Sequence, residues 1–439
     1  MRTKNMIKIL SFLFSLLLIL PATSFAQEEE DEDGFTFGGA VRYNVISESY
    51  ESDPTTLNTY ATWDTWRLNV DGSVADVDLS FEYRFYPTFA THFIHHGFLG
   101  YGLSDNVYME LGVTQVPFGI TTYASHSWWF QGPYYVGLED DYDMGLNFDI
   151  TPSDKMKLSL SYFRQAEPQG PASGGVNWSG PGSGRYSYDI VPGSGAYYDE
   201  ETETLVPVSA SIRELNQFNA RLAYNLNEDW EIGASAQLGQ IYNSNIDDSK
   251  WSTALAAHVV GNFAGFNLKA EYINYNYSAE SDDLNPAIDG NDTEELDIIQ
   301  MGAYGFPYDI AAEANLFVAG LAYSIPVEWG PISNVQPYVD FTLIDKANAN
   351  FENTYHLIPG FLLTAGSIYT YVDFALGKNQ PWLTEDFGTG LGQGRTWSGD
   401  AEDEGKFFYT EDAAKVGKPV PIDQVDWNLR FNINIGYYF

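Results

Sequence analysis

The clearest alternation of apolar and polar residues covers positions 425–439. Its apolar positions are Val425, Trp427, Leu429, Phe431, Ile433, Ile435, Tyr437 and Phe439. Successive side chains of a strand point to opposite faces, so this pattern predicts a strand with one apolar and one polar face. Strands of globular proteins usually have about 5–6 residues. This longer segment instead suits a strand that crosses a membrane, which needs about 9–11 tilted residues.

The same alternation predicts sixteen strands in all. They cover 35–47, 58–71, 74–86, 92–103, 106–115, 142–150, 156–163, 214–226, 230–241, 252–263, 266–277, 314–325, 334–344, 354–364, 367–376 and 425–439. The run 354–364 is the weakest, because Pro359 removes a ladder hydrogen bond.

Short and long connections alternate between these strands. The short ones include 72–73, 104–105, 151–155, 227–229 and 264–265, and the long ones include 116–141, 164–213, 278–313 and 377–424. This arrangement predicts an all-β fold: a 16-stranded antiparallel transmembrane β-barrel with short periplasmic turns and longer extracellular loops. The alternative is a secreted β-sandwich or propeller. Such a fold would bury its apolar faces in many short strands, and it would not end on a 15-residue strand with a terminal Phe. A water-exposed outer band of aromatic residues would promote aggregation, whereas a barrel in lipid requires it.

The N-terminus carries an export signal. Arg2, Lys4 and Lys8 precede the apolar core 9–20, and Ala26 ends a small-residue cleavage site. These features predict a secretory signal peptide over 1–26. The alternative, a membrane anchor, would need a longer apolar core.

The remaining chain divides simply. The acidic segment 27–34 predicts a periplasmic lead, and 35–439 predicts a single transmembrane barrel in the cell outer membrane. Removal of 1–26, which holds three basic and no acidic residues, takes the net charge from −39 to −42.

Composition removes several classes of protein. The net charge of −39 would repel the phosphates of a nucleic acid, so we expect no nucleic-acid partner. The chain has no Cys, which excludes disulfides and Cys-based metal sites. Aromatic residues make up 16% of the chain, more than a disordered protein would carry.

The C-terminal segment FNINIGYYF resembles the assembly signal of Gram-negative outer-membrane barrels. That resemblance implies recognition by the barrel-assembly machinery through Trp427, Phe431, Tyr437 and Phe439. Sixteen strands with a third outward connection folded into the lumen look like the trimeric porins, which implies a homotrimer. The segment ELGVTQVPFGI, Glu110 to Ile120, is similar to the phosphate-selective porin O and P family. The chain departs from that family because 116–141 contains no Lys or Arg, whereas anion pores use such residues.

Four arginines are predicted to form a basic patch on the inner wall. Arg430, Arg42, Arg67 and Arg84 stand at polar positions of the last and the first three strands, which adjoin when the barrel closes. Asp71, Asp78 and Glu82 lie on the same strands, so the alternative is that each arginine only satisfies a neighbouring carboxylate.

The inward third extracellular loop, 116–141, is predicted to narrow the pore. It carries an aromatic set followed by an acidic one: Trp128, Trp129, Phe130, Tyr134 and Tyr135, then Glu139, Asp140 and Asp141. Acidic groups opposite a basic wall would impose a transverse field in the lumen. The aromatics either pack the loop against the wall or offer a stacking surface for sugars.

Other chemistry finds little support. His92, His95 and His96 cannot converge on zinc, because strand parity places His95 on the opposite face from the other two. The chain has six His and shows no defensible Ser-His-Asp set, so we expect no enzyme activity. Oxygen ligands for Ca²⁺ occur in the acidic segment 278–313 at Asp283, Asp289, Asp292 and Glu294, but in no EF-hand spacing. We therefore predict no cofactor and no dedicated metal site.

These features together predict an outer-membrane porin, a passive channel for small hydrophilic solutes and ions. Its expected partners are outer-membrane lipid and lipopolysaccharide. Two alternatives stay open: a substrate-selective porin for sugars or organic acids, and a structural or adhesive barrel with a plugged lumen.

Overall fold

The structure, a computed structural model, describes residues 34–50, 57, 59–89, 91–169, 184–201, 204–287, 292–304, 306–383 and 427–439. Its compact unit spans Phe35–Phe439. The predicted signal peptide, 1–26, and positions 27–33 of the predicted acidic lead lie outside the described residues.

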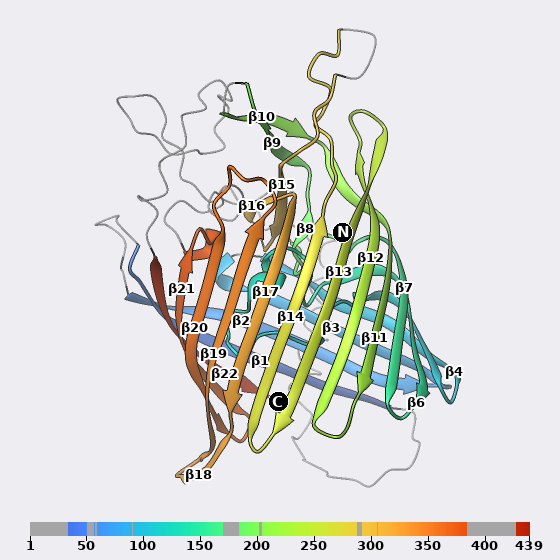
Figure 1. Ribbon diagram of the computed structural model, residues 1–439. Coiled ribbons are helices and arrows are strands. Elements are labelled where there is room, and N and C mark those ends of the chain that lie inside the picture. The colour runs from blue at the N-terminus through green and yellow to red at the C-terminus, as the bar shows by residue number, and fades with distance from the viewer. Residues whose placement is uncertain are drawn as a thin grey trace, which may run out of the picture. The chain divides into compact units, whose positions relative to one another are not determined.

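Consecutive antiparallel strands form a closed barrel, drawn in Figure 1. The barrel strands are β1 (Gly34–Glu48), β2 (Thr59–Val74), β3 (Val77–Tyr86), β4 (Thr91–Ser104), β5 (Val107–Gln115), β6 (Tyr142–Ser153), β7 (Met156–Ala166), β11 (Ile212–Asn225), β12 (Trp230–Asn243), β13 (Asp248–Phe263), β14 (Phe266–Asn276), β17 (Glu313–Tyr323) with its extension β18 (Ile325–Trp329), β19 (Ile332–Lys346), β20 (Thr354–Ala365), β21 (Ile368–Lys378) and β22 (Asn428–Tyr438).

The barrel closes between its first and last strands. β1 pairs with β22 from Ala40↔Tyr438 to Glu48↔Arg430. β17 and β18 pair in turn with β19, so they form one interrupted strand, and the barrel has 16 strands. The predicted fold class and strand number are therefore confirmed.

Side-chain exposure follows the predicted alternation. In β17, Phe317 is 46% exposed whereas its neighbour Val318 is 3% exposed. Large hydrophobic residues recur at the exposed positions of other strands, among them Trp66, Leu111 and Leu255. The outward face thus has the apolar character that a lipid-facing barrel requires. Among the described residues, no helix is long and apolar enough to cross a membrane.

Pro359 lies within a strand but disturbs it. It pairs with Val339 of β19. On the other side, the pairing of β20 with β21 is interrupted between Leu357↔Leu376 and Gly360↔Asp373. The missing amide hydrogen of proline accounts for this local gap.

Two long connections combine in a second sheet that alternation did not predict. β8 (Asp189–Ile190), β9 (Gly193–Asp199) and β10 (Thr204–Ala210) come from the connection after β7, and β15 (Ile298–Ala303) and β16 (Phe306–Ala311) from the connection after β14. They pair in the order β10-β9-β15-β16, with β8 on β15. Figure 1 shows β9 and β10 at the end of the barrel opposite the β18 hairpin.

The main apolar core joins this second sheet to the barrel wall. Ile299 and Met301 of β15 are fully buried, and they belong to one cluster with Ile273 of β14 and Leu316 of β17. The same cluster includes Phe118 from the connection 116–141. That connection also holds the short helix α2 (Gly132–Tyr135), and single 3-10 turns occur at Pro87–Phe89 and Pro381–Leu383.

Candidate functional site

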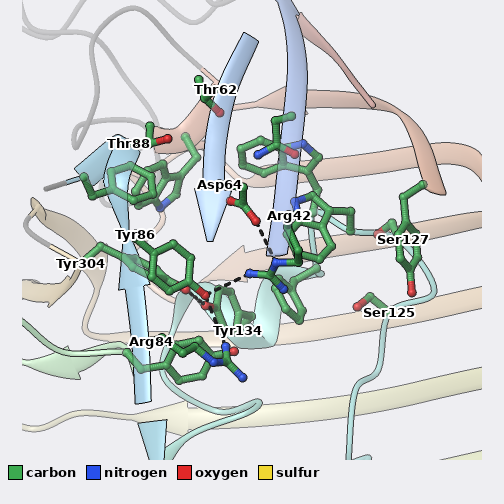
Figure 2. Close-up of a pocket in the computed structure, with 18 of the residues that line it drawn as sticks. Arg42, Thr62, Asp64, Arg84, Tyr86, Thr88, Ser125, Ser127, Tyr134 and Tyr304 are labelled. Atoms are coloured by element: carbon green, nitrogen blue, oxygen red, sulfur yellow. Dashed lines mark hydrogen bonds and ion pairs between the residues drawn. The ribbon is translucent and has the colours of Figure 1, made fainter. Parts of the chain in front are cut away.

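All four predicted arginines line one cavity of about 380 Å³. They come from adjacent strands: Arg430 from β22, Arg42 from β1, Arg67 from β2 and Arg84 from β3. Figure 2 shows Arg42 and Arg84 beside Asp64 and Tyr86 in this cavity. Strand parity and strand adjacency together bring these side chains to one place.

Two of the arginines pair with carboxylates on neighbouring strands. Nε of Arg42 lies 2.9 Å from Oδ2 of Asp64. Nη1 of Arg430 lies 3.0 Å from Oε1 of Glu48, the residue directly opposite in the β1–β22 register. Sequence reasoning named neither acid as a partner, because the pairing depends on the register between strands.

The other two arginines share one carboxylate. Arg67 and Arg84 stand directly opposite each other in the β2–β3 register, where like charges repel. Glu82 pairs with Nε of Arg84 and lies 3.6 Å from Nη1 of Arg67, which relieves that repulsion. The predicted alternatives Asp71 and Asp78 accept hydrogen bonds from Ser80 and Tyr108 instead. The four arginines of the cavity thus pair with three carboxylates, those of Glu48, Asp64 and Glu82, of which only Asp64 lines the cavity itself.

Both tryptophans of the predicted constriction loop stack on these arginines. The guanidinium carbon of Arg42 lies 4.2 Å from the ring centre of Trp128, and that of Arg430 lies 4.1 Å from the ring centre of Trp129. Such cation–π contacts favour a fixed ring position. The two rings therefore pack the loop against the wall, which leaves less of their faces for a sugar.

The backbone of this loop is held by carboxylates of the barrel strands. Asp340 of β19 accepts hydrogen bonds from the amide groups of His126 and Ser127, at 2.7 and 2.8 Å. Asp373 of β21 accepts one from the amide of Trp128 at 3.2 Å. Both carboxylates are fully buried, at 0% exposure, so their bonds to the loop replace water as their partner.

The remaining aromatic residues of the loop face a larger cluster of rings. Phe130 stacks on Tyr134 with 4.2 Å between ring centres. The hydroxyl groups of Tyr134 and Tyr304 are 2.6 Å apart, and Tyr135 donates a hydrogen bond to the carbonyl of Trp129 at 2.6 Å. Tyr134 and Tyr135 are 3% and 2% exposed, so their role here is packing.

The three acidic residues of the loop do not line the cavity. Glu139, Asp140 and Asp141 are buried, and Asp140 accepts a hydrogen bond from the hydroxyl of Tyr186. These acids are therefore not part of the lining that carries the four arginines. Sequence parity does not extend into a loop, so it gave no guide to these orientations.

Burial dominates the electrostatics of these acids. It raises the pKa of Glu139 well above its usual range, with nearby Glu271 adding to the effect. Burial also raises the pKa of Asp140, to about 7, although Tyr186 and Arg84 lower it in part. The pKa of Asp141 is raised by burial and by the charges of Asp189 and Glu214.

The histidine cluster differs from the expectation based on strict parity. A bulge between Glu82↔His96 and Tyr83↔Ile94 inserts His95 as an extra residue. The rings of His95 and His96 consequently lie together, with 2.9 Å between their Nδ1 atoms, and His92 contacts the hydroxyl of Tyr83 instead. The prediction that parity separates His95 from His96 was wrong.

The four aromatic residues of the predicted assembly signal belong to the last strand and its ends. Trp427, Tyr437 and Phe439 are 47%, 50% and 59% exposed, and the ring of Phe431 contacts that of Phe374 of β21 at a tilt, with 5.1 Å between ring centres. They lie on the outward face of β22, opposite Asn432 and Asn434, which are buried.

A second cavity of about 650 Å³ adjoins the first. It is lined by the turn between β13 and β14 and by Lys269 of β14, which donates hydrogen bonds to the loop carbonyls of Tyr123 and Ser125 at 2.7 and 3.0 Å. The two cavities share Ser125, His126 and Tyr371. Lys269 was missed by sequence reasoning because it lies across the barrel from the contiguous arginine strands.

Three tyrosines that flank the second sheet were also missed. Tyr186, Tyr188 and Tyr304 line the first cavity, and the guanidinium carbon of Arg84 lies 4.4 Å from the ring centre of Tyr186. They sit in long connections that alternation does not interpret, and no spacing signal in the sequence marks them.

The fold is similar to that of solved outer-membrane proteins. OmpT of Vibrio cholerae is 11% identical, over 94% of this chain and 99% of its own, with a TM-score of 0.51. Its in-vitro folded trimer form gives 11% identity, 93% and 100% coverage and a TM-score of 0.52. The outer membrane channel DcaP of Acinetobacter baumannii is 12% identical, over 94% of this chain and 99% of its own, with a TM-score of 0.51. The sequence matches no protein-family model and no curated protein. At these identities the likeness concerns the fold alone, a closed 16-stranded antiparallel β-barrel.

Proposed function

We propose that the protein is an outer-membrane porin, a passive, water-filled channel for small hydrophilic solutes and ions. The observation that carries this proposal is the pair of adjoining cavities on either side of the segment 116–141. One is lined by Thr62, Thr88 and Trp382, near long connections, and the other by the short turn at Ala264 and Gly265. A path from one barrel end to the other would run through both.

In this proposal the segment 116–141 is the constriction loop. It would cross the lumen, and the constriction would lie where the two cavities meet, at Ser125, His126 and Tyr371, which line both. Its support is the hydrogen bonds from the loop backbone to Asp340 and Asp373, whose side chains point away from the lipid-facing surface.

The proposal includes the route to the membrane and the assembly. Residues 1–26 direct export, the aromatic residues of β22 are read by the barrel-assembly machinery, and the barrel is a homotrimer among outer-membrane lipid and lipopolysaccharide. The structure named as a trimer form of OmpT gives the trimer its support. The proposal also includes membership of the phosphate-selective porin O and P family, which rests on the segment Glu110 to Ile120. It does not include phosphate as the solute, because 116–141 has no Lys or Arg.

A second candidate function is selectivity for small organic acids. Four guanidinium groups outnumber three carboxylates at the cavity, and the buried Nε atoms of Arg67 and Arg430 have no hydrogen-bond partner among the described residues. A carboxylate solute offers acceptors for such donors. Uptake of a dicarboxylate into proteoliposomes, compared with a neutral sugar of similar size, tests this: faster entry of the acid is expected, and equal rates contradict selectivity.

Planar-bilayer recording of the purified protein tests the porin itself. We expect stable ohmic conductance steps. Their absence, in a preparation that shows β-sheet circular dichroism and heat-modifiable migration, would contradict the proposal and favour a barrel with a plugged lumen.

A further inference from the structure

Three carboxylates converge away from the arginine cavity, where the constriction loop, the barrel wall and the second sheet meet. Asp141 ends the loop, Asp143 belongs to β6 and Asp189 belongs to β8. One oxygen of each lies within 4.8 Å of the others. We call Asp141, Asp143 and Asp189 the acidic junction.

The acidic junction is deeply buried and incompletely bonded. Its three residues are 6%, 1% and 1% exposed, in chain order. The Oδ1 atom of each has no hydrogen-bond partner among the described residues. Buried polar atoms in folded proteins are nearly always bonded to protein, water or an ion. Three clustered carboxylates that each keep an orphaned oxygen therefore call for a common partner.

The surroundings do not supply enough positive charge. Nη1 of Arg185 lies 3.0 Å from Oδ2 of Asp189. Gln217 donates a hydrogen bond to Oδ2 of Asp143 at 3.3 Å, which adds no charge. Two further acids, the buried Glu167 and the partly buried Glu214, act on the junction as like charges. Among the described residues, these clustered carboxylates pair with one guanidinium, that of Arg185. The negative charge that remains unbalanced attracts a divalent cation.

We propose that the acidic junction binds one Ca²⁺ ion through Asp141, Asp143 and Asp189. The ligands are all carboxylate oxygens, which hard cations prefer. They come from two stretches of the chain, Asp141 with Asp143 and the distant Asp189. Such a set adapts to the larger and less regular shell of Ca²⁺ more readily than to the strict octahedron of Mg²⁺.

The bound ion would tie together three parts of the molecule. Beside the junction, the amide of Val116 donates to the carbonyl of Asp141 at 2.8 Å, and the amides of Tyr186 and Ser187 donate to Oε1 of Glu167 at 3.0 Å. Ca²⁺ would add ionic links between the end of the loop, β6 and β8. It is thus a structural ion that holds the second sheet on the wall, and this role does not depend on what the channel conducts.

Isothermal titration calorimetry tests the site. The full-length protein is refolded without lipopolysaccharide, whose phosphates also bind Ca²⁺, treated with EDTA, exchanged into chelator-free buffer and titrated with CaCl₂ and then with MgCl₂. We expect one Ca²⁺ per chain with a dissociation constant of roughly 10⁻⁵ to 10⁻³ M, and weaker binding of Mg²⁺. Tighter binding of Mg²⁺ would overturn the assignment to Ca²⁺.

Two double variants locate the ion. Asp141→Asn with Asp189→Asn keeps the side-chain shapes, removes two like charges and should abolish Ca²⁺ binding. Asp283→Asn with Asp292→Asn removes the same charge from the acidic connection after β14 and should bind as the parent does. Loss of binding in the second variant with retention in the first would move the site to that connection and overturn the proposal.

Thermal unfolding separates loss of the site from loss of the fold. Ca²⁺ at a hundredfold excess over its dissociation constant should stabilise the parent by about 2.7 kcal/mol. The Asp141→Asn, Asp189→Asn variant should unfold in EDTA at or above the temperature of the parent and gain nothing from Ca²⁺. A parent barrel that neither binds nor is stabilised by Ca²⁺ would refute the inference.

Discussion

Each arginine of the cavity affects ions according to the carboxylate beside it. Arg42 is 6% exposed and its nearest carboxylate, on Asp64, is 7% exposed. The two opposite charges therefore largely cancel, and the pair adds little net charge to the cavity. Arg67 is the least closely paired of the four, at 3.6 Å from Glu82. The field of the cavity thus depends on small differences between paired groups, which low-dielectric walls strengthen.

Replacing two arginines should change ion selectivity. In Arg42→Ala with Arg67→Ala, the carboxylates of Asp64 and Glu82 keep their charge, so the reversal potential should move toward cations. The measurement is made across a tenfold salt gradient, where a perfectly selective pore gives about 59 mV. An unchanged reversal potential would contradict a role of these arginines in selectivity.

The matched control is Asp64→Asn, which removes the opposite charge at the same place. It should move the reversal potential toward anions. Because a buried charge that loses its partner costs roughly 3–5 kcal/mol, heat-modifiable migration must first show that each variant is folded.

At the scale of elements, alternation predicts the barrel strands well and the packed interior poorly. Strands such as β12 carry apolar residues outward and Gln237 inward, and such patterns locate every barrel strand within a few residues. β17 keeps the alternation of exposure but not that of polarity, because the buried inner residues Leu316 and Val318 are apolar like the outward Phe317. A strand that is apolar on both faces has packing partners on both sides. These inner apolar positions, together with Ile273 and Tyr275 of β14, belong to the cluster that includes β15 of the second sheet.

The site could be predicted only as far as strand geometry reaches. Strand parity and strand adjacency suffice to predict that Arg42, Arg67, Arg84 and Arg430 line one cavity, because these residues lie on regular strands. They fail at His95, where a bulge adds one residue, and at Asp140, which lies in a loop. The sequence also does not indicate that β8 pairs with β15, because that contact depends on two loops more than 100 residues apart.

Removing part of the constriction loop should widen the pore. Deletion of 125–132 removes Trp128 and Trp129 and the amide groups that bind Asp340, so single-channel conductance should rise. A deletion of equal length within 384–426 shows what shortening a long connection does by itself. Equal conductance of the loop deletion and the parent, with both barrels folded, would place the narrowing elsewhere.

Closure of the whole barrel depends on the close approach of β1 to its neighbours. The amide of Gly39 donates to the carbonyl of Phe439 at 2.8 Å, and the amide of Phe439 donates back to Gly39 at 3.1 Å. A Cβ atom on Gly39 would meet the carbonyl oxygen of Arg67 on β2 inside van der Waals contact and the ring of Phe439 at 3.0 Å. A side chain at this position therefore presses on both strands that flank β1.

Gly39→Val should weaken this seam by roughly 1–3 kcal/mol, the usual cost of overpacking. The folded barrel should lose its heat-modifiable form at a lower temperature than the parent. Gly102→Val on β4 is the matched control, because a Cβ atom there meets nothing within 4 Å. Pairing between the first and last strands removes the exposed edges of a membrane sheet. Equal melting temperatures of the two variants would mean that closure tolerates a displaced β1. The other fifteen strands would then hold the barrel together.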